Sequence, residues 1–231
     1  MEYPRFEYQP LSPEQIDNLA RSFMIKNYPD NERQPLTLTE KEEQELDQFL
    51  ETASQEQKDI VDKKAQWKRK YFTYINKSAS PEEKEQIEED MEKDPEFKDY
   101  IERTQAWALA ERYSMWRYGV EKAEEDPDGR IFDMDDSEIF TFFNLLESHP
   151  DVIDEALGMM SSEIHAGPYK NSKFMIRPNE GNYMTERQKL LELRDYFTGK
   201  IGEDEKDSLH NEIIDNPAFR SMFVKIQNAL R

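Results

Sequence analysis

Glutamate and aspartate residues at short helical spacing are the chemically most distinctive feature of this chain. Between residues 82 and 96 they include Glu82, Glu85, Glu88, Glu89, Glu92, Asp94 and Glu96. Side chains three or four positions apart on a helix are neighbours, about 5–6 Å from one another. A row of carboxylates at this spacing suits a basic protein surface and resembles a row of phosphates. We therefore take these seven residues as the candidate partner-binding site.

Most of the negative charge lies around this row. The chain has 51 acidic and 31 basic residues, a net charge of −20. Residues 82–138 contain 21 acidic and 8 basic residues, so these 57 positions carry −13 of that charge. Nucleic acids and anionic membranes repel such a surface. We expect a protein partner with a basic surface, no direct nucleic-acid binding and no membrane binding.

A second acidic segment, residues 124–135, has the spacing of a calcium-binding loop. Read as twelve positions, it has acidic residues at 1, 3 and 5, glycine at 6 and isoleucine at 8. It resembles an EF-hand loop, which binds Ca²⁺ through oxygen ligands and turns at the glycine. Glu at position 1, Pro at position 4 and Asp at position 12 depart from the EF-hand pattern. The candidate metal ligands are Glu124, Asp126, Asp128, Arg130 and Asp135; an acidic turn without metal is the alternative, in which case no cofactor is expected.

A long basic connection over residues 166–183 is the third candidate site. It contains Lys170, Lys173 and Arg177 among asparagine and glycine residues. Long connections inside compact domains often carry function. We interpret it either as a small-molecule or peptide site or as a simple connection between helical subdomains. Residues 173–177 and 130–134 each have the composition of a short strand, and the two segments could pair.

Signals for catalysis are poor. The three histidines, His149, His165 and His210, are far apart in sequence and lie in no metal-ligand or catalytic motif. Cysteine is absent, and no phosphate-binding glycine loop is present. The chain also shows no secretory signal and no apolar run long enough to span a membrane. These features predict a non-enzymatic, cytoplasmic protein.

The elements that position these residues are predicted to be helices. Glycine is rare, with 7 residues, and capping-box sequences start at Ser12, Thr39, Ser80 and Thr185. The predicted helices cover residues 13–26, 40–53, 55–77, 81–93, 95–124, 137–148, 150–165, 185–198, 203–214 and 217–230. The helix over 95–124 carries Trp107, Tyr113, Trp116 and Tyr118 on several faces, which indicates a buried hub.

Two further patterns concern how the helices meet. In the helix over 55–77, lysines alternate with aromatic residues, and we expect the aromatic residues to pack inward while the lysines face solvent or the acidic helix that follows. The dipeptides Asp94-Pro95, His149-Pro150 and Asn216-Pro217 each separate two predicted helices. At such a corner one residue caps a helix and proline opens the next. The corners are either a local solution used three times or traces of a duplicated helical hairpin.

The sequence therefore predicts an all-α fold, an irregular bundle of about ten helices with at most one two-strand pairing. We expect subdomains at 1–130, with the acidic surface and the aromatic hub, and at 131–231, or else one compact unit. The favoured function is an adaptor or inhibitor that binds a protein through the acidic region 82–138. The alternatives are a nucleic-acid mimic that blocks a DNA- or RNA-binding protein, and a regulator that binds a divalent cation at 124–135.

Overall fold

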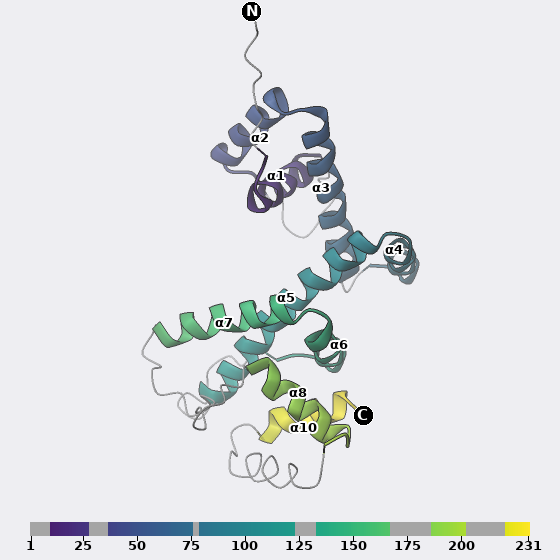
Figure 1. Cartoon of the computed structure of the whole chain (residues 1–231), viewed down its shortest axis with the longest axis vertical. Helices are drawn as coiled ribbons and strands as arrows, with labels where there is room; N and C mark the ends of the chain where they lie inside the picture. Colours follow the sequence, from purple (N-terminus) through teal and green to yellow (C-terminus); the bar gives the residue numbers. More distant parts are fainter. Residues whose placement is uncertain (1–9, 28–36, 76–78, 123–132, 167–185, 202–219) are drawn as a thin grey trace, which may run out of the picture. The chain divides into compact units, whose positions relative to one another are not determined.

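The computed structural model describes residues 10–27, 37–75, 79–122, 133–166, 186–201 and 220–231 (Figure 1). Their helices are α1 (Pro13–Asn27), α2 (Glu40–Thr52), α3 (Gln55–Ile75), α4 (Pro81–Lys93), α5 (Pro95–Lys122), α6 (Asp136–Ser148), α7 (Pro150–Ala166), α8 (Glu186–Phe197) and α10 (Arg220–Ala229). The predicted all-α fold is confirmed. The described part holds nine helices rather than ten and no strand, and the predicted helix over 203–214 lies outside it. Of the predicted strand pair, only residues 133 and 134 are described, and neither is in a strand.

The chain divides into two compact units, an N-terminal unit, Met1–Ile101, and a C-terminal unit, Glu102–Arg231. The boundary lies within α5, earlier than the division after residue 130 that the sequence predicts. Each unit has its own buried core.

In the N-terminal unit, α1, α2 and α3 enclose one core (Figure 1). Its buried residues are Ala20, Met24, Leu46, Phe49, Val61 and Ala65. The helices begin where the sequence predicts because their N-terminal amides are capped: Ser12 Oγ accepts from Gln15 N at 3.1 Å, and Thr39 and Glu42 form a complete capping box. Helix α3 continues beyond this core and contributes to a second one.

The second core of this unit joins α3, α4 and the start of α5. Tyr71, Ile87, Phe97 and Ile101 are buried there, and Trp67 packs against them. The centroid of the Trp67 ring system lies 5.8 Å from that of Phe97. Tyr71 is buried on α3 and Tyr74 is partly buried against this core, as the sequence predicts, whereas Phe72 of the same helix is 42% exposed.

The C-terminal unit is built around the aromatic part of α5. Tyr113 and Trp116 are buried, and the Tyr113 ring stacks on Phe142 of α6 with centroids 5.3 Å apart. Burial raises the pKa of the Tyr113 hydroxyl well above its ordinary value. Residues of α6, α7, α8 and α10 complete the core. The predicted buried hub is therefore confirmed.

Two of the three predicted helix corners are described, and they share one backbone arrangement. Asp94 N donates to Asp90 O at 3.0 Å while Asp94 O accepts from Lys98 N at 3.0 Å. His149 makes the matching pair of bonds to Leu145 and Ile153, at 3.1 and 3.2 Å. One residue thus ends the first helix and starts the second. The corner at Asn216-Pro217 lies outside the described residues.

Candidate functional site

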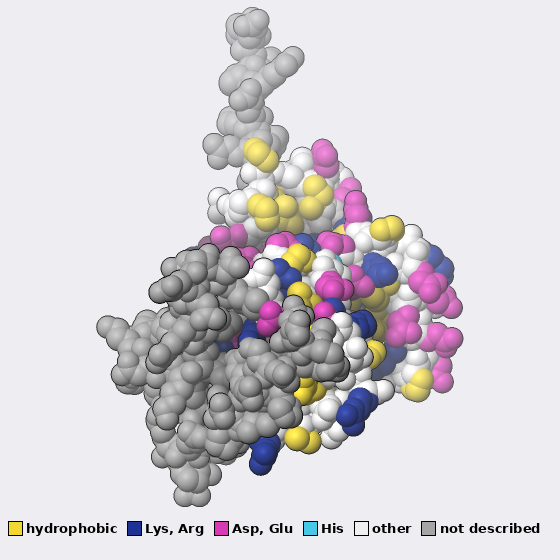
Figure 2. All heavy atoms as spheres, turned by 60° about the horizontal axis from the view of Figure 1, so that its bottom comes forward, with side chains coloured by type: hydrophobic (Ala, Val, Ile, Leu, Met, Phe, Trp, Pro, Cys, Tyr) yellow, Lys and Arg dark blue, Asp and Glu magenta, His cyan; other side chains and the backbone are white. Residues whose placement is uncertain are grey.

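Five glutamates of α4 form one exposed surface, which we call the acidic stripe. It consists of Glu82, Glu85, Glu88, Glu89 and Glu92, all of them exposed. Successive helical residues are about 100° apart, so these five side chains fall within an arc of about 120°. Ile87, the buried residue of α4, lies on the opposite side of the helix. Acidic side chains gather at the right of Figure 2, where Figure 1 places α4.

Local contacts hold α4 in place and leave the acidic stripe exposed to solvent. Ser80 and Glu83 form a capping box at its N-terminus. On the inner side, Lys70 Nζ of α3 lies 2.7 Å from Asp90 Oδ2. This hydrogen bond holds the pKa of the Asp90 carboxyl below its ordinary value. Ile87 and the Lys70–Asp90 pair therefore orient the helix.

The stripe residues differ in how far they are already paired. Glu82, Glu85 and Glu92 make no ion pair with another described residue. Glu89 pairs with Lys93 at 3.0 Å, and Glu88 accepts a weak bond from the Tyr74 hydroxyl at 3.5 Å. Glu82, Glu85 and Glu92 are thus the carboxylates most available to a partner.

The other two predicted partner-binding residues have structural roles. Asp94 Oδ1 accepts from the backbone amides of Glu96 and Phe97, at 3.1 and 3.2 Å, and so caps α5. Glu96 accepts from Lys63 Nζ at 2.9 Å. The structure brings five of the seven predicted residues together on one face and places these two beside the α4–α5 corner.

Helix α3 supplies the cations that link it to α1, α4 and α5 within the N-terminal unit. Lys68 pairs with Asp17 of α1 at 2.8 Å, Lys70 pairs with α4 as described, and Lys63 pairs with α5. Lys64 lies over the Tyr100 ring, 4.1 Å from its centroid, and burial lowers the pKa of its amine. These four lysines of α3 therefore make their contacts inside the unit.

Helix α2 is a second acidic helix that the sequence reasoning missed. It contains six acidic residues and one basic residue. Glu40, Glu43 and Glu51 are exposed on it. Residues 1–81 as a whole contain 15 acidic and 12 basic residues, because the basic helix α3 offsets the charge of α2. The charge of each helix taken separately identifies α2.

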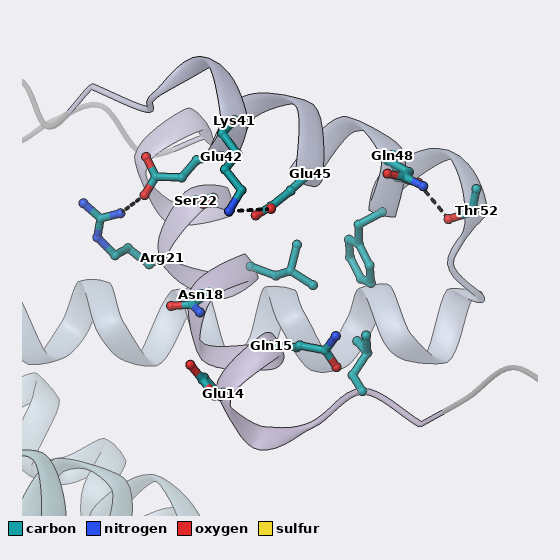
Figure 3. A pocket seen from close by; sticks show the side chains of 13 residues that line it. Glu14, Gln15, Asn18, Arg21, Ser22, Lys41, Glu42, Glu45, Gln48 and Thr52 are labelled. Carbon is teal, nitrogen blue, oxygen red and sulfur yellow. Dashed lines mark hydrogen bonds and ion pairs between the residues drawn. The ribbon is translucent and has the colours of Figure 1, made fainter.

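A polar pocket lies between α1 and α2 (Figure 3). Its volume is about 790 Å³, and its rim carries the ion pairs Arg21–Glu42 at 2.5 Å and Lys41–Glu45 at 3.5 Å. Ser22, which is 5% exposed, lines it without a hydrogen bond to any described residue. Because the rim cations are already paired, they are not free to bind an anionic ligand.

The predicted metal loop and basic loop fall mainly outside the described residues. Glu124, Asp126, Asp128 and Arg130 lie there, as do Lys170, Lys173 and Arg177. Asp135 is described: its Oδ1 accepts from Glu138 N at 3.0 Å, and the two residues form the capping box of α6. The D-x-x-E spacing of this box was present in the sequence. No group of three metal-ligating side chains occurs within the described ranges.

His149 is the one histidine with a described side chain, and it is buried at the α6–α7 corner. Its Nε2 lies 3.1 Å from Glu102 Oε2. Beside it, Arg103 bonds to Asp151 at 2.8 Å. These contacts tie α5 to α7 and account for the histidine structurally.

In the part of the chain that the structure describes, no helix combines the length and the apolar character needed to cross a membrane.

Comparisons of the chain with protein-family models, with characterised proteins and with solved structures give no match. The acidic stripe, defined by its exposure and its arc on α4, is therefore the candidate functional site.

Proposed function

We propose that the chain is a non-enzymatic adaptor or inhibitor that binds a protein with a basic surface through the acidic stripe. The observation that carries the proposal is the separation of acidic and buried residues on α4. Five exposed glutamates lie on one side of the helix, and the buried residue Ile87 lies on the opposite side. Three of these carboxylates make no ion pair with a described residue. Complementary charge raises the association rate and selects the partner.

Charge reversal on α4 tests this proposal. In the triple variant Glu82→Lys, Glu85→Lys, Glu92→Lys, proteins retained by the immobilised wild-type chain from a host extract should no longer be retained. The matched control is Glu40→Lys, Glu43→Lys, Glu51→Lys on α2, which changes the net charge equally. Quantitative mass spectrometry compares the retained proteins. If both triple variants lose the same proteins to the same extent, binding follows overall charge and the stripe is not the site.

Nucleic-acid mimicry is the second candidate, and charge spacing favours it. The stripe spans ten residue steps, about 15 Å of helix, so its five charges lie about one per 3–4 Å. One strand of duplex DNA carries a charge every 3.4 Å along the helix axis, which is similar. A mimic occupies the nucleic-acid cleft of its partner, so duplex DNA should release the retained proteins. If duplex DNA does not release the retained proteins, nucleic-acid mimicry is wrong and the adaptor or inhibitor function remains the proposal.

A further inference from the structure

The polar pocket between α1 and α2 contains a buried hydroxyl group that the fold itself does not use. Ser22 lines this pocket of about 790 Å³ and is 5% exposed, and its hydroxyl makes no hydrogen bond to another described residue. Buried polar groups are nearly always hydrogen-bonded. Pockets of about 300–1,000 Å³ are typical of small-molecule sites. The Ser22 hydroxyl is therefore available to a small molecule that fills the pocket.

The charged side chains of the pocket leave one carboxylate unpaired. Three carboxylates and two cations line it. Arg21 pairs with Glu42 at 2.5 Å, and Lys41 pairs with Glu45 at 3.5 Å. The fifth charged residue, Glu14, is exposed and makes no ion pair with a described residue. The lining therefore has one surplus negative charge, which favours a cationic ligand over an anionic one.

Two leucines supply an apolar wall beside these polar groups. Leu11 and Leu19 line the pocket and are only partly buried, so part of each side chain remains accessible to a ligand. Both also pack against the core of α1, α2 and α3. The wall is therefore held in place by the fold and can contact an apolar group without rearrangement.

The spacing of Glu14 and Ser22 sets the length of a ligand that reaches both. Glu14 lies near one end of the stretch of α1 that lines the pocket, and Ser22 lies near the other (Figure 3). They are eight residues apart, which is about 12 Å along the helix axis. Two hydrogen bonds of about 2.8 Å take up part of this distance, so the two polar ends of the ligand are roughly 6–8 Å apart.

We propose that this pocket binds a small primary amine that has an apolar body and a hydroxyl group at its far end. The ammonium group donates to the Glu14 carboxylate, and the apolar body lies against Leu11 and Leu19. The far hydroxyl group exchanges a hydrogen bond with the Ser22 hydroxyl. The pocket shares no residue with the acidic stripe, so this is a second binding activity beyond the proposed function.

Three compounds with the same hydroxyphenyl body test the charge of the ligand. Tyramine, tyrosol and para-hydroxyphenylacetate end in an ammonium, a hydroxyl and a carboxylate group, respectively. Titrations of the full chain followed by NMR give each Kd. Tyramine should bind about tenfold more tightly than tyrosol, because hydrogen bonds between charged groups are stronger, and the carboxylate should bind most weakly. Equal affinity for tyramine and tyrosol overturns the inference, as do shift changes confined to residues outside α1 and α2.

A variant of Glu14 separates this site from the general attraction of a negatively charged protein. Glu14→Gln should weaken tyramine binding about tenfold and leave tyrosol binding unchanged. The matched control is Glu51→Gln, an exposed position of α2 outside the pocket, which changes the net charge equally. If the two variants weaken tyramine binding to the same extent, tyramine follows the overall charge and the inference is wrong.

The role of Ser22 is tested with phenethylamine, which is tyramine without the phenol hydroxyl group. Ser22→Ala should weaken tyramine binding about fivefold and leave phenethylamine binding unchanged. Circular dichroism checks that the helices are intact. Equal tyramine binding by wild type and Ser22→Ala overturns the inference. The triple variant of the acidic stripe keeps every residue of the pocket and should bind tyramine as wild type does, whether or not it still retains partner proteins.

Discussion

Ser22 is a buried hydroxyl without a described hydrogen-bond partner, whereas buried Ser114 donates to Ala110 O at 2.9 Å. A buried polar group left unpaired costs stability, and serine has a lower helix propensity than alanine. We expect Ser22→Ala to raise the free energy of unfolding by about 1 kcal/mol, measured by urea denaturation. Ser114→Ala, which removes a satisfied hydroxyl, should change it by less. A loss of stability in Ser22→Ala would show that the hydroxyl is paired in solution.

The partner of each charged side chain could not be predicted from the sequence. The Lys70–Asp90 pair joins residues 20 positions apart, and it depends on how α3 and α4 cross. Several other carboxylates of α4 would have suited Lys70 equally well by type. Charge composition predicts that such pairs form, but only the helix packing selects the partner.

Helix boundaries were predictable because their determinants are local. The capping boxes at Thr39 and Ser80 appear in the structure with both reciprocal hydrogen bonds. Proline after Asp94 and after His149 marks the corners, as the sequence predicts. Asp135 shows the opposite case: the same residue type serves a cap or a metal site, and its carboxylate is used at the start of α6.

The α4–α5 corner yields a prediction about capping. Removing the Asp94 carboxylate in Asp94→Ala leaves the amides of Glu96 and Phe97 without their acceptor. We expect a loss of about 1 kcal/mol in the free energy of unfolding. Asp99→Ala, an exposed position of α5 with the same change in charge, is the control for urea denaturation. If the two variants are equally stable, the carboxylate does not contribute as a cap.

At the scale of the whole molecule, several arginines in the described part of the chain join one helix to another. Arg21 links α1 to α2, Arg103 links α5 to α7, and Arg194 links α8 to α6. With 51 acidic and 31 basic residues, pairing of every cation still leaves negative charge at the surface. The surface of the protein is therefore predominantly anionic, even though each of these ion pairs is itself neutral.

This arrangement gives the stability a definite pH dependence. Hydrogen bonds from Thr39 and then Arg21 lower the pKa of the Glu42 carboxyl, and bonds from Lys70, Arg194 and Arg103 lower the pKa values of Asp90, Glu147 and Asp151. A lowered pKa in the folded state contributes stability above the ordinary value, and that stability is lost as the pH falls through the folded value.

We expect Tm to hold or rise slightly from pH 7 to about pH 5, because protonation of unpaired carboxylates relieves repulsion, and to fall below about pH 4. Thermal denaturation followed by circular dichroism measures this profile. A Tm that falls steadily from pH 7 downward would contradict it.

The corner at Asp94 has a consequence for how this protein can change in evolution. A single residue ends α4 and begins α5, so no connecting residue exists to absorb a change in length. One residue inserted into α4 would rotate everything after it by about 100° around the helix axis. Inserted between Glu88 and Glu89, such a residue would widen the arc of the five stripe side chains from about 120° to about 200°. Substitutions can tune this surface gradually, whereas insertions and deletions between Ser80 and Asp94 are expected to be absent from related sequences.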